Sequence, residues 1–134
     1  LSRLALALSA VAGSGGSVTL VLDEVDTGIG GETAARVGDV LHRIGLRQQV
    51  VAVTHRPEIA ARATTHLVVE KQDAVIRPTA QVDSVDGERR VAEVARLMSG
   101  RTTRAALARA AELLQEGRSA AAASARPAPA ISTM

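Results

Sequence analysis

The 134-residue sequence contains no cysteine and no phenylalanine, tyrosine or tryptophan. The lack of cysteine excludes disulfides, thiolate metal sites and cysteine nucleophiles. The lack of aromatic rings excludes a platform on which the bases of single-stranded nucleic acid could stack. Leucine, valine, isoleucine and alanine must therefore fill the core, and with 46% apolar residues the chain has enough of them.

Two further absences bear on the surroundings of the chain. No apolar run approaches the roughly 20 residues that span a bilayer, and no signal-peptide pattern is present at the start. We therefore expect no membrane partner. The net charge is only +2 and the arginines are spread along the chain without a block. This charge pattern favours a solvated surface over a nucleic-acid footprint.

Apolar patterns alternate between strands and helices along the chain. The expected strands cover residues 17–22, 49–54, 66–70 and 74–82, and the expected helices cover 32–44 and, briefly, 57–63. The first two strands are continuously apolar, as in strands buried on both faces of a parallel sheet. Pro78 cannot donate a backbone hydrogen bond to a central ladder, so we expect the last strand to lie at an edge of the sheet. Alternation of strand and helix in this order is the pattern of right-handed βαβ units.

Helical patterns also occupy both ends of the sequence. Residues 1–12 are rich in strong helix formers and are followed by a glycine-rich stretch. Beyond Gly87 two apolar stripes are separated by Gly100, and Thr102 or Thr103 is expected to cap the second helix. From Gly117 onwards the sequence is alanine, serine, proline and arginine, so we expect a disordered tail over 117–134.

The strongest chemical signal is the pair Asp23–Glu24, directly after the first buried strand. A parallel strand delivers its last side chains to the carboxyl edge of the sheet, where ligands of open α/β folds bind. There Asp23 can hold Mg²⁺, a hard cation that takes carboxylate oxygens. Glu24 can orient and polarise the attacking water of nucleotide hydrolysis. The alternative is an acidic turn that only caps the next helix.

Two neighbouring features support the chemical interpretation. The segment from Asp26 to Gly31 also contains Gly28 and Gly30, and three glycines permit a loop to approach phosphates or another subunit closely. His55 follows the second buried strand, at the same edge of the sheet, where it could hydrogen-bond a terminal phosphate and the catalytic water. The alternatives are a flexible connection for the glycines and an ordinary polar strand end for the histidine.

The sequence has no phosphate-binding loop of the Gly-x-x-x-x-Gly-Lys-Ser/Thr type. The chain can supply a metal carboxylate, a water-orienting glutamate and a phosphate-sensing histidine, but not the phosphate cradle. We therefore expect the chain alone to bind ATP poorly and to hydrolyse it scarcely at all. The other histidines, His42 and His66, have no partner at ligand spacing, so no zinc site is expected.

Three segments carry a resemblance to a known family. Residues 1–3 (LSR) resemble the end of the ABC signature motif, residues 19–31 (TLVLDEVDTGIGG) a Walker B and D-loop segment, and residues 51–60 (VAVTHRPEIA) a switch-histidine segment. Together they resemble the RecN family of bacterial DNA repair proteins, which are SMC-like, ABC-type ATPases. The resemblance covers roughly residues 1–116, and the string DEVDTGIGG is its most specific part.

The resemblance implies an α/β fold that forms the C-terminal lobe of an ABC/SMC-type P-loop ATPase head. Its mostly parallel sheet would be flanked by helices and incomplete without the N-terminal part. The implied cofactors are ATP and Mg²⁺, with ATP between two heads of a homodimer. Asp23 is then the Mg²⁺ ligand of Walker B, Glu24 the catalytic base and His55 the switch histidine. The remaining nucleotide-binding residues would be Ser2, Arg3, Asp26, Gly28, Gly30 and Gly31.

The implied function is ATP hydrolysis by a full-length protein of recombinational DNA double-strand-break repair. Its partners would be DNA and recombination proteins, and its location the cytoplasm, at the nucleoid. Residues 1–116 would form the C-terminal part of the ATPase head. Two alternatives remain: an SMC-type chromosome-organising or other ABC ATPase head, which the string GIGG at residues 28–31 disfavours, and a non-catalytic dimerisation module.

Overall fold

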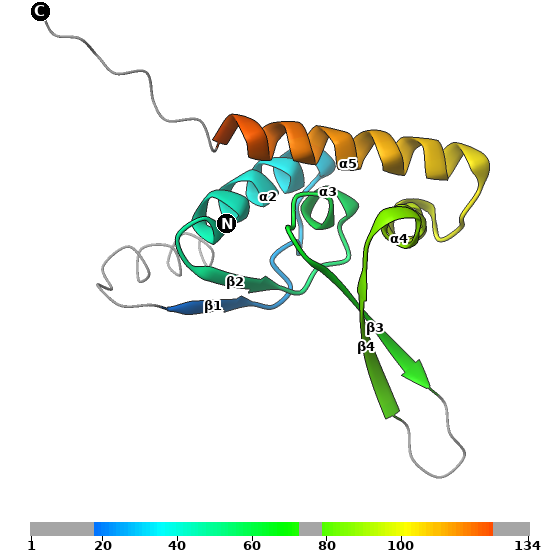
Figure 1. The fold of residues 1–134 in the computed structure, drawn as a ribbon, viewed down its shortest axis with the longest axis horizontal. Helices are drawn as coiled ribbons and strands as arrows, with labels where there is room; N and C mark the ends of the chain where they lie inside the picture. Colours follow the sequence, from blue (N-terminus) through cyan, green and yellow to red (C-terminus); the bar gives the residue numbers. More distant parts are fainter. Residues whose placement is uncertain (1–17, 73–78, 125–134) are drawn as a thin grey trace, which may run out of the picture.

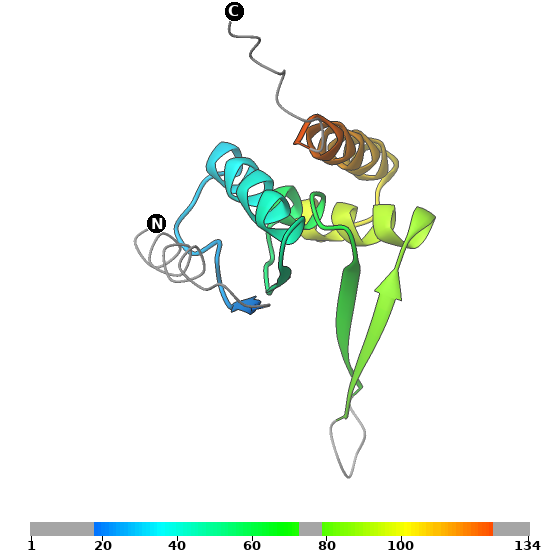
Figure 2. The ribbon, with the colours of Figure 1, turned by 60° about the vertical axis from the view of Figure 1, so that its left-hand side comes forward.

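The computed structural model describes residues 18–72 and 79–124. The elements within these ranges are β1 (Thr19–Leu22), α2 (Gly31–Gly45), β2 (Gln49–Ala52), α3 (Pro57–Ala60), β3 (His66–Gln72), β4 (Thr79–Val85), α4 (Gly87–Ser99) and α5 (Arg104–Ser124). The helices gather on one side of the strands, and the β3–β4 hairpin projects away from them (Figures 1 and 2). No helix of the described ranges is long and apolar enough to cross a membrane.

Strands β1 and β2 are parallel neighbours. Leu20 lies opposite Val50 in the ladder, and Leu22 lies opposite Ala52. Parallel neighbours need a crossover connection, and α2 supplies it. The predicted succession of strand, helix and strand is therefore confirmed, with small differences at the ends of the elements.

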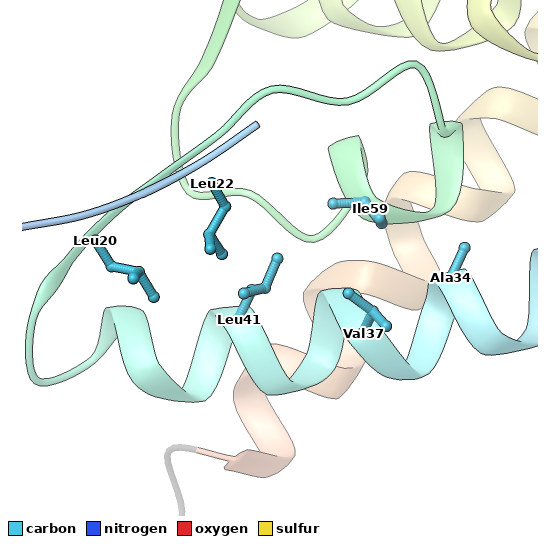
Figure 3. Packing of buried hydrophobic residues seen from close by; sticks show 6 residues of the cluster. All are labelled: Leu20, Leu22, Ala34, Val37, Leu41 and Ile59. Carbon is cyan, nitrogen blue, oxygen red and sulfur yellow. The ribbon is translucent and has the colours of Figure 1, made fainter. Parts of the chain in front are cut away.

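The inner face of this strand pair packs on α2 and α3, and Figure 3 shows the contact. Side chains alternate along a strand, so Leu20 and Leu22 point to the same side. The helix residues that meet them recur at helical spacing. The buried cluster consists of Leu20, Leu22, Ala34, Val37, Leu41 and Ile59. Burial of each leucine contributes about 1.5–3 kcal/mol to folding.

The opposite face of β1 and β2 is open. Val21 is 67% exposed, Val51 is 42% exposed and Val53 is 56% exposed. Val21 and Val51 are directly opposite each other in the register. The prediction of strands buried on both faces is therefore wrong for this chain, because α2 covers one face and no described element covers the other. These three valines are called the open face below.

Strands β3 and β4 form a separate two-stranded antiparallel sheet. The predicted α/β class is confirmed, but the prediction that the third strand continues the parallel βαβ series is wrong. Only the short segment 73–78, which lies outside the described residues, joins β3 to β4, whereas a parallel pair would need a crossover of a dozen or more residues. Strand β4 runs over Thr79–Val85, later than the expected range of 74–82.

Helices α4 and α5 pack against each other and against the end of α3. Helix α4 ends at Gly100, whose φ of 70° is in the left-handed region that favours glycine. The hydroxyl of Thr103 accepts a hydrogen bond from the amide of Ala106 at 3.2 Å, which confirms Thr103 as a helix cap. The buried cluster between these helices consists of Ala61, Val94, Ala95, Ala110, Leu113 and Leu114.

Helix α5 continues to Ser124. The prediction of a disordered tail from Gly117 is therefore wrong for residues 117–124. Two causes explain the difference. Alanine, which dominates this stretch, is the strongest helix former. In addition, Gly117 is buried against the backbone of Ala61, so the helix still has a packing contact there. Residues 125–134 and the helix predicted over 1–12 lie outside the described residues.

Candidate functional site

The carboxyl ends of β1 and β2 lie at one edge of the parallel pair. The amide of Val53 donates to the carbonyl of Leu22 at 2.8 Å, which extends the pairing to the last residue of β1. Asp23 and Glu24 follow β1 directly, and His55 follows β2 by three residues. The parallel register therefore brings the two predicted groups of polar residues to the same edge.

Glu24 has an unusual backbone conformation. Its φ is 51°, and it is the only residue other than glycine with a positive φ in the described ranges. The carbonyl of Glu24 accepts hydrogen bonds from the amide of Thr27 at 3.4 Å and from its hydroxyl at 3.2 Å. The left-handed conformation costs a non-glycine residue about 1–2 kcal/mol. The chain therefore turns sharply at Glu24, and both Asp23 and Glu24 are exposed to solvent.

Asp26 lies inside the molecule at 1% exposure. One of its carboxylate oxygens, Oδ2, accepts a hydrogen bond from the hydroxyl of Thr54. The same oxygen accepts from the amide of His55 at 2.9 Å and from the amide of Arg56 at 3.2 Å. The loop after β1 is thus joined to the segment after β2 through a single carboxylate.

The pKa of Asp26 lies below the usual value of an aspartate. Burial is the largest influence and by itself raises the pKa, since it penalises the charged form. The hydrogen bonds from the Thr54 hydroxyl and the His55 amide, with the charge of the His55 ring, outweigh burial and lower it. Asp26 is therefore a charged carboxylate at neutral pH.

The His55 ring lies between this carboxylate and solvent. Its Nδ1 is 3.2 Å from Oδ2 of Asp26, while its side chain is 74% exposed. In a neutral imidazole one nitrogen carries the proton and the other accepts. A carboxylate beside Nδ1 favours the proton on Nδ1, which leaves Nε2 as the nitrogen available to a ligand.

Arg56 holds the glycine-rich loop in place. Its guanidinium Nη2 donates to the carbonyl of Ile29 at 2.6 Å. Within the loop, Gly28 has a φ of 74°, a conformation that side chains rarely adopt. Gly30 is the N-cap of α2, and a Cβ atom on Gly31 would lie 2.8 Å from Oε1 of Glu58. The hydrogen bond from Arg56 therefore attaches the loop to the segment that follows β2.

The described residues contain no group of three or more histidine, cysteine, aspartate or glutamate side chains that could hold a metal ion alone. Mg²⁺ does not require such a group, because it keeps several waters and is bound through one or two carboxylates together with substrate phosphates. The exposed carboxylate of Asp23 at the sheet edge fits that mode of binding.

A surface cavity of about 460 Å³ is lined in part by His55. Its lining includes Pro57, Glu58, Met98 and Arg109, but neither Asp23 nor Glu24. Within the described residues, Asp23 and Glu24 at the carboxylate edge are both exposed to solvent.

Comparison with known proteins identifies related sequences. The chain is 46% identical to DNA repair protein RecN of Deinococcus radiodurans over 114 residues, 85% of this chain and 20% of that protein. It is 46% identical to RecN of Treponema pallidum over 119 residues, 87% of this chain and 21% of that protein. For RecN of Bacillus subtilis the identity is 37% over 101 residues, 75% of this chain and 18% of that protein. The matched part of this chain belongs to the RecN family.

The chain spans about a fifth of the length of these RecN relatives. No family model matches it. A solved structure from work on ATP-driven dimerization and DNA-stimulated activation of SMC ATPases aligns with a TM-score of 0.56 at 20% identity. The alignment covers 65% of this chain and 51% of that one. The fold is therefore that of part of an SMC-type ATPase head, as the RecN resemblance implied.

The structure brings together some of the residues expected of a RecN site. Asp26 and His55 are in contact, whereas within the described residues neither Asp23 nor Glu24 bonds to His55. Asp26 differs from the expected nucleotide ligand, because its carboxylate faces the interior. Ser2 and Arg3 lie outside the described residues, and Gly28, Gly30 and Gly31 all belong to the loop that leads into α2.

Sequence reasoning missed two residues of this site, Thr54 and Arg56. Thr54 donates to Asp26, and Arg56 donates to both Asp26 and Ile29. The signal that could have identified them is their position beside His55, at the end of a strand whose parallel neighbour ends in acidic residues.

Proposed function

We propose that this chain supplies the carboxylate and histidine half of an ATP-hydrolysing site in a DNA repair protein of the RecN type. The observation that carries the proposal is the meeting of two strand ends. The loop after Asp23 and Glu24 is joined through Asp26 to His55. The similarity to RecN proteins supports repair of DNA as the process that the complete protein serves.

In this proposal the two exposed carboxylates have separate tasks. Asp23 holds Mg²⁺, which when bound offsets the negative charge of the phosphates. Glu24 accepts a hydrogen bond from the attacking water and orients it, as a general base must lie within hydrogen-bond reach of the proton that it takes.

His55 faces the terminal phosphate in the same proposal. When the ring is protonated on both nitrogens, Nε2 can donate to a phosphate oxygen, and when the ring is neutral with its proton on Nδ1, Nε2 can accept from the catalytic water. Gly28, Gly30 and Gly31 let the loop run close to the nucleotide, and Ser2 and Arg3 contribute beside the signature motif of the second head. The phosphate-binding loop must come from residues beyond this chain, since the sequence contains none.

The partners follow from the composite nature of the site. A head-to-head homodimer would enclose ATP between the carboxylate edge and a second surface, because Asp23 and Glu24 are exposed in the part of the chain that the structure describes. DNA and recombination proteins would bind other parts of the complete protein. The proposed setting is recombinational repair of double-strand breaks in the cytoplasm, at the nucleoid.

The experiment that tests this function is Glu24→Gln in the complete protein. Glutamine keeps the size of the side chain but cannot take a proton, so ATP should still bind while hydrolysis falls by about 100-fold or more. Glu32→Gln is the matched control, since Glu32 is an exposed glutamate of α2 paired with Arg36. Unchanged turnover in the Glu24 variant would contradict the assignment of Glu24 as the base.

A second candidate function is favoured by the open face of Val21, Val51 and Val53. Exposed apolar patches often mark interaction sites, so the chain could serve as a docking lobe without catalysis. The same ATPase measurement separates the two candidates. Hydrolysis by the complete protein that depends on Glu24 supports the catalytic proposal, whereas ATP-independent assembly without hydrolysis supports the docking lobe.

A further inference from the structure

We propose that Asp26 is a positioning residue that fixes the orientation and tautomer of His55, and that it does not bind the nucleotide. The inference rests on the proposed function, because it concerns the histidine of the same site. Its basis is the geometry around one carboxylate oxygen, Oδ2 of Asp26.

The burial of Asp26 excludes direct contact with a ligand. Its side chain is 1% exposed, whereas the His55 side chain in front of it is 74% exposed. A charged carboxylate is stable inside a protein only when donors satisfy it. Three successive donors, one from each of Thr54, His55 and Arg56, reach Oδ2 of Asp26, while its Oδ1 is buried without a hydrogen-bond partner within the described residues. The carboxylate is therefore a fixed part of the fold.

One hydrogen bond and one close approach to the same oxygen hold His55. Its backbone amide donates to Oδ2 at 2.9 Å, and its ring Nδ1 lies 3.2 Å from Oδ2. An amide and a ring nitrogen of one residue that share an acceptor restrict both side-chain torsions. The neutral ring must then carry its proton on Nδ1, because a carboxylate can only accept. Nε2 of the neutral ring then has a lone pair, which can accept a hydrogen bond from a water.

Thr54 supports this arrangement from the side. Its hydroxyl donates to Oδ2 of Asp26, and its oxygen accepts from the amide of Arg56 at 3.0 Å. The acceptor for the histidine is therefore itself held by a second set of bonds.

The first experiment is histidine-selective nitrogen NMR of the complete protein at about pH 8.5, where an ordinary histidine is neutral. The His55→Ala variant identifies the signal. We expect the neutral His55 ring to carry its proton on Nδ1, and Asp26→Ala, which removes the acceptor oxygen altogether, to lose that preference. A wild-type ring protonated on Nε2 would overturn the inference whether or not the protein hydrolyses ATP.

The second experiment is a double-mutant cycle on ATP hydrolysis. Asp26→Asn keeps an oxygen for the backbone amides and removes the charge behind the ring. We expect kcat to fall by about 10- to 100-fold, the usual loss when the partner behind a working histidine is removed, with KM for ATP unchanged. In the His55→Ala background the same substitution should cost no more than about twofold.

The control for this cycle is Asp39→Asn. Asp39 forms an ion pair of 2.5 Å with Arg62, which joins α2 to the segment after α3. Asp39→Asn should leave the kcat of ATP hydrolysis near that of the wild type. Equal losses from Asp26→Asn with and without His55 would overturn the inference but leave the proposed function standing. Absence of ATP hydrolysis in the wild type would overturn the proposed function, while the NMR result would still decide the role of Asp26.

Discussion

The guanidinium of Arg56 donates a hydrogen bond of 2.6 Å to the carbonyl oxygen of Ile29, and so attaches the glycine-rich loop to the start of α3. Arg56 also donates from its backbone to Asp26, a bond that a side-chain substitution leaves in place. The two contacts can therefore be separated by experiment.

Arg56→Ala should loosen the loop without unfolding the site. A hydrogen bond contributes about 0.5–1.5 kcal/mol, so the amides of residues 28–31 should exchange about two- to tenfold faster with solvent. Hydrogen-exchange mass spectrometry of the complete protein measures this directly. Arg36→Ala, at an exposed arginine of α2, is the control and should leave the exchange of the loop unchanged.

Gly28 and Gly30 should respond differently to alanine. Gly28 has a φ of 74°, so Gly28→Ala should lower the free energy of unfolding by about 1–2 kcal/mol. At Gly30 the φ is −80° and a Cβ atom would meet no other atom within 4 Å. Gly30→Ala should therefore leave the fold intact, and any loss of ATP affinity in that variant would come from contact with the nucleotide or a second subunit. Melting temperature and ATP binding, measured on both variants, test the difference.

Gly117→Ala should weaken the attachment of α5. Alanine is the better helix former by about 1 kcal/mol, but its Cβ would collide with the carbonyl group of Ala61. Overpacking of this kind costs about 1–3 kcal/mol, so the net effect should be destabilising. Gly45→Ala is the matched control, because a Cβ there meets nothing within 4 Å. A melting temperature for Gly117→Ala at or above that of Gly45→Ala would contradict the packing described.

His66 should make the protein less stable in mild acid. Burial lowers its pKa, and the charge of Arg90 lowers it further against the opposing influence of Glu93. The folded state therefore resists protonation of this ring. Its contribution to stability is complete above the unfolded pKa of about 6.5 and is lost as the pH falls through the lower folded value.

His66→Gln should reduce the fall in melting temperature between about pH 7.5 and pH 5. His42→Gln is the control, and the fall should persist in it because His66 remains. An identical pH dependence in the wild type and the His66 variant would show that another group is responsible.

Local signals in the sequence were sufficient for much of the fold. The apolar run before Asp23, the helical spacing of Val37 and Leu41, and the glycine at position 100 each act within a few residues. The pairing of β3 was not predictable in the same way, because the run that begins at His66 reads alike in a parallel and an antiparallel strand. Its partner is set by the short connection to β4.

Some residues of the candidate site could be predicted from the sequence and others could not. Asp23 and Glu24 could be selected because they end a buried strand, and His55 because it follows the next one. The interior position of Asp26 could not be predicted, since all three acids of the string DEVD look alike in sequence. Only the pairing of β1 with β2 brings the donors of Thr54 and Arg56 to that one carboxylate.

The open face of Val21, Val51 and Val53 has a practical consequence for anyone who produces this chain. Three exposed valines that lie close together on a two-stranded sheet favour self-association at the concentrations of purification. Polar replacements such as Val21→Thr and Val51→Thr, which retain the branched shape suited to a strand, should improve the solubility of the chain while leaving the packing of Leu20 and Leu22 on α2 undisturbed.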